Sequence, residues 1–405
     1  MENIPAFKRG EEKMKKTDER VVKLTQTLIQ NRSYSGEEGG VSNALKEFFE
    51  ANGFDDVHID RYGNTIGHIK GNRPGPAVLM DGHMDTVPVT NEAEWKHPPF
   101  AAEIHDDRIY GRGASDMKGA LAAMAVAASE FKEETNGDFA GDIYVAGIVH
   151  EECFEGVAAR EVSAYAKPDY VVIGEASLGN LKIGQRGRAE IKVETIGKPA
   201  HSANPEKGIN AVYKMCDLIK AIAELEPTHH DVLGDGILEL VDIKSAPYPG
   251  ASVVPERCIA TYDRRLLVGE TKESVIAPIL ECIEKLEAKD PQFKAKAYYS
   301  EGEEACFTGE TIKADRFFPG WLFDKNEDWI VAIHEEMKKE GLNPEITQYN
   351  FCTNGSHYAG EAGIKTIGLG PSQENLAHTL NEYIELDELL KIQKGYVAVL
   401  TALLK

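Results

Sequence analysis

Two segments of this chain have the length of a strand and are mostly apolar. DIYVAGIV (142–149) and PDYVVIG (168–174) are bounded by turn signals, and helical patterns lie before and after them. Alternation of apolar strands with helices is typical of an α/β domain, in which helices flank a largely parallel sheet. In such a sheet the functional residues gather beyond the carboxyl ends of the strands. The residues that directly follow each strand are therefore the first candidates for a site.

The order of the predicted elements changes after about Gly184. From there the patterns read strand, helix, strand, strand, helix, strand, which is the order of a ferredoxin-like α+β unit. The rest of the chain returns to alternating helices and short strands. A length of 405 residues also favours two domains over one. We expect a catalytic domain built from residues 1–184 and 301–405, with a ferredoxin-like lid or dimerisation domain inserted at 185–300.

The formal net charge of -22 is spread along the chain without an acidic tail. It argues for solubility and against binding to nucleic acid or to an anionic membrane. The polar N-terminal sequence lacks the apolar core of a signal peptide, and no apolar run approaches the ~20 residues of a membrane span. The six cysteines form no C-x-x-C pair, which predicts neither a disulfide framework nor a cysteine zinc site. These features together predict a cytoplasmic protein.

His83 and Asp85 stand two apart where an apolar strand breaks into a turn. Residues two apart in extended chain share a face, so the carboxylate can hold the imidazole or bind beside it. Alone, the pair is more typical of a polar turn after a strand than of a functional site. Asp116 lies where a small-residue-rich helix begins, and there Ser115 and Asp116 are ordinary helix N-cap and first-turn residues. The glycines around Asp116 favour the close backbone approach of a buried site.

Adjacent carboxylates, Glu151 and Glu152, emerge from the end of the strand DIYVAGIV. The H-E-x-x-H zinc motif fails here, because Phe154 takes the place of the second histidine. Packed like charges disfavour joint ionisation unless a cation is present. Glu175 follows the next apolar strand, and His378 lies in a loop before the last helix. Two histidines and several carboxylates form the mixed nitrogen and oxygen ligand set that zinc and related divalent ions accept.

Five motifs occur in order along nearly the whole chain: GHMDTVP, GRGASDMKG, HEECFEG, GEAS and GLGPSQENLAHTLNE. Together they resemble the zinc-dependent exopeptidases and deacylases, which include aminoacylase, acetylornithine deacetylase, succinyl-diaminopimelate desuccinylase and glutamate carboxypeptidases. GQRGRAEI, DRRLLVGET and NFCTNG are similar to the selenium-metabolism-linked (YgeY-like) branch of hydrolases.

The resemblance implies a pair of divalent metal ions, zinc first, with manganese or cobalt as alternatives. It implies five metal ligands: His83, Asp116, Glu152, Glu175 and His378. His83 and Glu175 would hold one ion, Glu152 and His378 the other, and Asp116 would bridge them. Asp85 would orient His83, and the unligated Glu151 would act as the general base.

The same resemblance extends to the inserted domain. His201, in IGKPAHSANPEKGINA, falls on the lid motif whose histidine reaches into the partner subunit's site to stabilise the oxyanion. This implies a homodimer built through the insert. From the residues alone, His201 is a loop histidine before a proline.

Further residues are expected to bind substrate. Arg265 matches the family's arginine for a substrate carboxylate, with Arg264 as the second choice, because a guanidinium binds carboxylate in a bidentate manner. Thr353, Asn354 and Gly355 align with a segment that lines the pocket. Where many relatives have a substrate-contacting Asn, this chain has Ser252, so their specificities do not transfer.

We therefore expect a di-metal amidohydrolase that cleaves an amide or ureido C–N bond of a small N-acyl or N-carbamoyl amino acid. A dipeptidase or carboxypeptidase acting on short peptides is the near alternative. A non-catalytic relative that binds a ligand in the retained pocket is the alternative of another class. Loss of a metal ligand or of the base would favour that class, and this chain keeps all six residues concerned.

Overall fold

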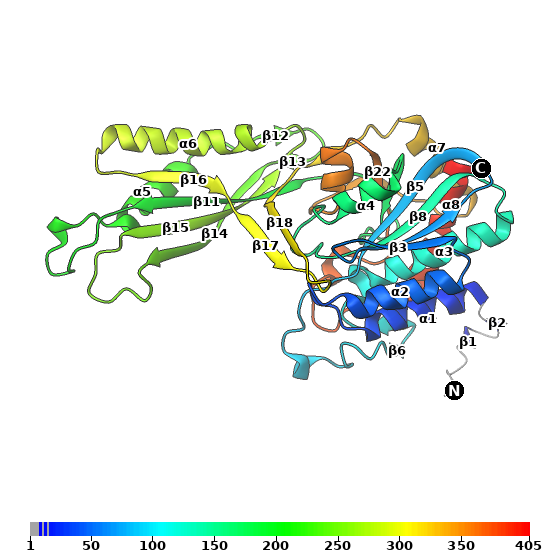
Figure 1. The fold of residues 1–405 in the computed structure, drawn as a ribbon. Coiled ribbons are helices and arrows are strands. Elements are labelled where there is room, and N and C mark those ends of the chain that lie inside the picture. Colours follow the sequence, from blue (N-terminus) through cyan, green and yellow to red (C-terminus); the bar gives the residue numbers. More distant parts are fainter. Residues whose placement is uncertain (1–7, 10–11, 14–15) are drawn as a thin grey trace.

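The computed structural model describes residues 8–9, 12–13 and 16–405. Two sheets, each with its own hydrophobic core, organise the molecule. Figure 1 shows the smaller unit, with helices α5 and α6, extending to one side of the larger unit, which carries the C-terminus. Among the described residues, no helix is long and apolar enough to cross a membrane.

The larger sheet has nine strands, in the order β20-β10-β22-β9-β5-β8-β4-β3, with β21 paired to β10. Its four central strands, β22, β9, β5 and β8, run parallel, whereas β3, β4 and β20 pair antiparallel at the flanks. The sheet is thus mixed, and parallel at its centre. Its strands are β3 (Asp56–Ile59), β4 (Thr65–Lys70), β5 (Arg73–His83), β8 (Ala140–Ile148), β9 (Tyr170–Ile173), β10 (Leu181–Gln185), β20 (Trp321–Leu322), β21 (Ile346–Tyr349) and β22 (Lys365–Gly368).

Helices flank this sheet, and α3 is the most deeply buried of those described. Its alanine-rich sequence lets it pack closely against α1, α8 and strands β5 and β8. The sequence pattern placed Ser115 and Asp116 at the start of this helix, and that prediction is wrong. An irregular turn, η2 (Ala114–Lys118), comes first, and Asp116 has non-helical backbone angles. The helices of this unit are α1 (Lys16–Gln30), α2 (Gly39–Ala51), α3 (Gly119–Thr135), α4 (Ala159–Ala166), α7 (Asp328–Lys339) and α8 (Leu386–Leu404).

The smaller unit has the predicted order of strand, helix, strand, strand, helix, strand. Its strands lie in the antiparallel order β14-β15-β11-β16, which is a ferredoxin-like arrangement, and β19 (Phe317–Phe318) pairs with the start of β11. The expected α/β unit with an inserted α+β unit is confirmed, and the boundaries at residues 185 and 300 stay predictions. Its main elements are β11 (Gly187–Ile196), α5 (Ala211–Ala223), β14 (Ile237–Ala246), β15 (Arg257–Leu266), α6 (Lys272–Lys289) and β16 (Ala295–Tyr299).

Apart from the pair β1–β2, three short sheets complete the described structure. One joins β6 (Ile104–His105), β7 (Arg108–Tyr110) and β23 (Tyr383–Glu385), so it holds the chain before α3 beside the chain before α8. The other two are hairpins of β17 (Glu301–Ala305) with β18 (Thr311–Asp315) and of β12 (His229–His230) with β13 (Gly234–Asp235). Strands β1 (Lys8–Arg9) and β2 (Glu12–Lys13) also pair.

Candidate metal centre and active-site pocket

Three neighbouring parallel strands deliver candidate ligands to one edge of the larger sheet. His83 is the last residue of β5 and is level with Ile148, the last residue of β8. Glu151 and Glu152 follow β8 after a short turn, and Glu175 follows β9. Because the carboxyl ends of parallel strands meet at one edge, residues far apart in the sequence converge there.

Two loops supply the remaining candidates. Asp116 comes from the irregular turn before α3, and His378 from the loop before β23, where its φ is 60°. Glu382 connects these loops from a fully buried position: its carboxylate accepts hydrogen bonds from the backbone N–H of Ser115 at 2.9 Å and of Asp116 at 3.1 Å, and from Arg112 Nη1 at 2.6 Å. Glu382 is therefore the residue that fixes Asp116 beside His378.

The Asp116 carboxylate lies between the two histidines. One oxygen, Oδ1, is 2.9 Å from His83 Nε2, and the other, Oδ2, is 3.1 Å from His378 Nε2. Glu175 Oε1 lies 3.4 Å from the same His83 nitrogen, and Glu152 Oε2 lies 3.0 Å from the same His378 nitrogen. The cluster thus has two halves, each with one imidazole and one glutamate, that share Asp116.

This arrangement fits a pair of divalent cations. Each half offers one nitrogen and at least two oxygens, which is a ligand set that zinc and related ions accept. The second oxygen of Glu152, Oε1, is buried, and it has no hydrogen-bond partner in the described part of the chain. A buried carboxylate oxygen without a donor is costly, and a bound cation satisfies it.

Asp85 contacts His83 through its backbone carbonyl and the turn of Glu151 and Glu152 through its side-chain carboxylate. His83 Nδ1 donates to the backbone carbonyl of Asp85 at 2.8 Å, which leaves Nε2 free to face Asp116. The Asp85 carboxylate instead accepts from the backbone N–H of Glu151 at 3.0 Å and of Glu152 at 3.2 Å. It therefore anchors the turn that presents the two adjacent glutamates.

The crowded carboxylates repel one another in this buried site. Burial raises the pKa of Glu152, and the nearby Asp116 carboxylate adds to the rise, which takes it to about 7. Burial also raises the pKa of Glu151 well above its usual range, and the charges of Glu175 and Glu152 add to that rise. Such a group of acids is stable either protonated or next to positive charge, so a cation pair would lower these pKa values again.

The same carboxylates also raise the pKa values of the two histidines, and for an imidazole this favours the positively charged form. Hydrogen bonds to Asp116 and Glu152 raise the pKa of His378 to about 10. Burial lowers the pKa of His83, but hydrogen bonds to Asp116 and Glu175 outweigh this and raise it well above its usual value. Both rings are thus held in a field that attracts positive charge, which a metal ion would supply while the rings stay neutral.

A pocket of about 390 Å³ opens over the cluster, a size suited to a small molecule. Five of the predicted site residues on the metal side line it, together with Arg265 from the smaller unit. The lining residues are Asp116, Glu151, Glu152, Glu155, Glu175, Ala176, Arg188, Arg265, Phe351, Cys352, Glu374, Ala377 and His378.

Arg188 is a pocket residue that sequence reasoning missed. It lies directly opposite Arg265 on the neighbouring strand. Arg188 Nε donates to Asp263 at 2.8 Å and Nη1 to Glu155 at 3.1 Å, while Arg265 Nε lies 2.8 Å from the other oxygen of Asp263. The signal was present as the second arginine of GQRGRAEI, but only the strand register places it in the pocket.

The remaining predicted substrate residues lie outside the lining of this pocket. Arg264 is turned to the other face of β15, where it pairs with Glu270 at 2.5 Å. Thr353, Asn354 and Gly355 are buried beneath the pocket, and Asn354 donates to Asp81 at 3.0 Å. Phe351 and Cys352, just before them, form the wall instead.

His201 is exposed on the inserted unit and does not line the pocket of its own chain. Its Nδ1 accepts from the backbone N–H of Ala203 at 3.0 Å. Ser252 lies next to it, and its carbonyl accepts from the backbone N–H of Ser202 at 2.9 Å. In this structure His201 therefore lies apart from the candidate metal centre of its own chain.

Comparison with known proteins gives the family. The sequence matches the profile of peptidase family M20/M25/M40 over residues 79–402. The chain belongs to this family. It is 31% identical over 406 residues to the uncharacterized protein YgeY of Escherichia coli strain K12, with 98% of this chain and 97% of that protein covered. It is also 27% identical to succinyl-diaminopimelate desuccinylase 2 of Ruegeria sp. strain TM1040, with 94% of each chain covered.

Solved structures share the fold. Aminopeptidase PepT from Bacillus cereus has a TM-score of 0.74 at 21% identity, with 95% of this chain and 98% of that chain covered. The Bacillus subtilis YXEP protein, described as a dinuclear metal-binding peptidase of the M20 family, has a TM-score of 0.69 at 13% identity, with 95% and 98% covered. Membership of the M20 family makes the protein a metal-dependent hydrolase that acts on amide bonds.

Proposed function

We propose that this M20 family protein hydrolyses the amide or ureido C–N bond of a small N-acyl or N-carbamoyl amino acid. One observation carries the proposal: a pocket of about 390 Å³ is lined both by His378 and the carboxylates of the cluster, from the larger unit, and by two arginines, Arg188 and Arg265, from the smaller unit. A substrate that fits must place its scissile bond at the cluster and an anionic group at the arginines. An N-substituted amino acid with a free carboxylate has both features.

The cluster divides naturally between two cations. His83 and Glu175 would hold one, Glu152 and His378 the other, and the two oxygens of Asp116 would serve one each. When bound, the cations acidify a water molecule and polarise the substrate carbonyl. The mixed nitrogen and oxygen ligands favour zinc, with manganese and cobalt as alternatives.

Glu151 is the residue proposed to move the proton. It is buried at the pocket wall beside His83 and Glu175, and its backbone is held by Asp85. Its carboxylate would take a proton from the attacking water and deliver it to the leaving nitrogen, so that the C–N bond breaks and an amine leaves.

Arg188 and Arg265 are proposed to bind the substrate carboxylate. Their guanidinium groups are fixed by the shared partner Asp263, which lies 2.8 Å from a nitrogen of each. Planar guanidinium groups held in this way pair with carboxylate through directed hydrogen bonds. The two arginines thereby set the distance between the anionic end of the substrate and the bond that is cut.

A homodimer formed through the inserted unit is also proposed. Strand β14 is an edge strand of its sheet, and Val241 and Ile243 on it are 58% and 48% exposed. An unpaired edge with exposed apolar residues is a surface that a second copy can cover. In such a dimer His201 would reach the partner subunit's pocket and stabilise the oxyanion. The cytoplasmic location stays a prediction.

A substrate panel tests the proposed function. Purified protein is loaded with zinc, manganese or cobalt and assayed on N-acetyl, N-succinyl and N-carbamoyl amino acids and on dipeptides. Turnover of an N-acyl or N-carbamoyl amino acid with a higher kcat/KM than that of any dipeptide is the expected result. Turnover of dipeptides alone would replace the proposal with a dipeptidase, and no turnover with any metal would point to the non-catalytic alternative.

A further inference from the structure

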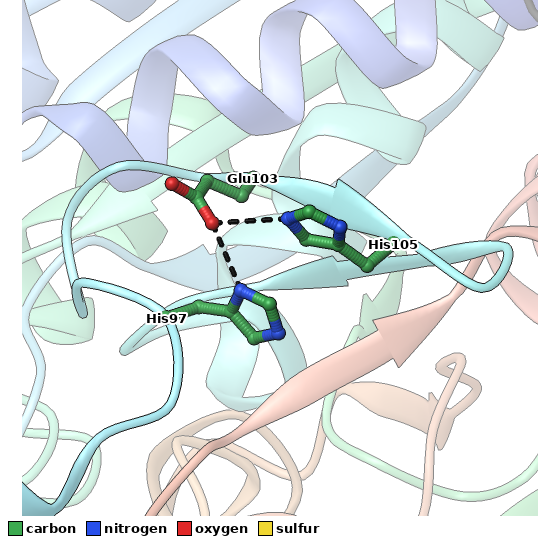
Figure 2. A group of neighbouring side chains, drawn as sticks. All are labelled: His97, Glu103 and His105. Carbon is green, nitrogen blue, oxygen red and sulfur yellow. Dashed lines mark hydrogen bonds and ion pairs between the residues drawn. The ribbon is translucent and has the colours of Figure 1, made fainter.

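A second group of metal-ligating side chains lies outside the pocket, on the chain that leads into β7. Figure 2 shows His97, Glu103 and His105 pointing toward one another. His97 Nδ1 and His105 Nε2 lie 2.8 Å and 3.0 Å from the same oxygen, Oε2 of Glu103. One ligand atom from each residue lies within 4.8 Å of the other two. We call these three residues the outer triad.

A tight hairpin fixes two members of the outer triad. Glu103 and His105 stand two apart on the chain entering β6, so their side chains share one side. The turn that follows is made by Asp106 and Asp107, whose φ values of 49° and 58° match a two-residue turn of type I′. Strand β7 then pairs back onto β6 and holds both side chains in place.

The third member is held from two directions. The ring of His97 stacks on the ring of His105 at 4.3 Å between centroids and lies 4.4 Å from the ring of Tyr110. Just before it, the backbone N–H of Lys96 donates to Asn381 Oδ1 at 2.6 Å. The imidazole is therefore positioned in advance of any ligand, which reduces the entropy lost on binding.

Two imidazoles and one carboxylate favour zinc and its neighbours over calcium or magnesium, which prefer oxygen ligands. The N···O spacings of the outer triad, 2.8 and 3.0 Å, nearly match the 2.9 to 3.4 Å of the catalytic cluster. Ligand atoms around tetrahedral zinc are about 3.4 Å apart, so an ion requires only a small opening of the triad.

The surroundings leave room for a cation. The side chains of His97, Glu103 and His105 are 23%, 41% and 49% exposed, so water can complete the coordination. In the described part of the chain, the ion pairs of Glu103 are with these two histidines, and neither lysine nor arginine competes for its carboxylate.

We propose that the outer triad is a third metal site, which binds one transition-metal ion of the zinc class. The ion joins the loop that carries His97 to the β6–β7 hairpin. Strand β7 pairs with β23, which begins five residues after His378, so the ion braces the chain that supports one half of the catalytic cluster. This site does not depend on which substrate the pocket accepts.

Metal stoichiometry tests the proposal. The intact protein is first loaded with zinc and desalted, then dialysed against increasing zinc concentrations, and bound metal per chain is measured by plasma mass spectrometry. The variants are His105→Ala and the isosteric Glu103→Gln. His229→Ala is the matched control. His229 is also an exposed histidine paired with carboxylates, since its two ring nitrogens lie near Asp231 and Asp235. Its ion pairs are with these two aspartates, and no second histidine takes part in them.

The wild type should bind one ion per chain beyond those of the catalytic cluster, and its melting temperature should rise as that ion binds. His105→Ala and Glu103→Gln should weaken this binding at least ~10-fold and lose the rise, while His229→Ala keeps both. Circular dichroism equal to wild type in the absence of added metal would show that the variants are folded. Absence of the additional ion in the wild type, or its retention in both triad variants, would overturn the proposal.

Discussion

Replacing Asp85 by Asn separates the two tasks that the structure gives this residue. The backbone carbonyl that accepts from His83 is unchanged in Asp85→Asn, so the orientation of His83 should be kept. The carboxylate, however, accepts from the backbone N–H of Glu151 and of Glu152 through its two different oxygens. In the variant one of those oxygens becomes an NH₂ group, which faces an N–H donor and cannot accept.

The structure sets the size of the effect. Asp85 Oδ2 also accepts from Ser35 Oγ at 2.7 Å, and a hydroxyl can reverse its role, so the NH₂ group should turn toward Ser35 and Glu152. One hydrogen bond to a charged group is then lost, which costs about 1.5–3 kcal/mol. If that cost falls on the turn that positions Glu151 and Glu152, kcat/KM should fall about 10- to 150-fold.

The assay is kcat/KM on the best substrate of the panel, with bound metal and circular dichroism measured on the same samples. Ser35→Ala is the control, because it removes one donor to Asp85 and leaves both backbone hydrogen bonds. Because the backbone N–H of Glu152 still donates to Asp85 Oδ2, this control should lose less kcat/KM than Asp85→Asn. An Asp85→Asn variant with wild-type kcat/KM would refute the view that this carboxylate holds the turn.

Three further predictions follow from the same geometry. Glu151→Gln should keep its bound metal and lower kcat at least ~100-fold, because an amide cannot accept the proton, and unchanged kcat would remove Glu151 as the base. Arg188→Ala should raise KM about 10-fold or more for a substrate with a free carboxylate and much less for its methyl ester, whereas equal losses would contradict carboxylate binding. Burial raises the pKa of Glu361, but hydrogen bonds from His357 and Arg160 outweigh this and lower it from 4.5 to about 2. The ionised carboxylate thus stabilises the fold above pH 5, and this contribution is lost as the pH falls toward 2. Glu361→Gln should therefore lower the free energy of unfolding by about 1 kcal/mol at pH 7 and by less at pH 3 in urea titrations, and an equal difference at both would refute the assignment.

The placement of the candidate metal ligands could be predicted because local signals mark each one. His83 ends one apolar strand, and Glu152 and Glu175 follow shortly after two others. The carboxyl ends of parallel strands meet at one edge, and this can be inferred without any knowledge of side-chain packing. Asp116 was found for a partly wrong reason. The glycines around it indicated close backbone approach, but its turn is irregular, and Glu382, 266 residues later, accepts a hydrogen bond from its backbone N–H. That interaction leaves no local trace in the sequence.

The arginines that line the pocket could not be predicted from local sequence patterns, because strand packing and register decide which side chains face it. Arg264 and Arg265 are adjacent on β15, so their side chains point to opposite faces of the sheet. Their sequence gives both the same local pattern, and only the packing of the inserted unit decides that Arg265 faces the pocket. The same register puts Arg188 opposite Arg265.

A shift of one residue in that pairing would turn these side chains to the other face while leaving every candidate metal ligand in place. Under the proposed function, the chemistry of the pocket is thus encoded mainly in the strand ends of the larger sheet and the loops beside them, and its specificity in the register of β11 with β15. Changes in substrate choice within this fold should therefore concentrate on those two strands.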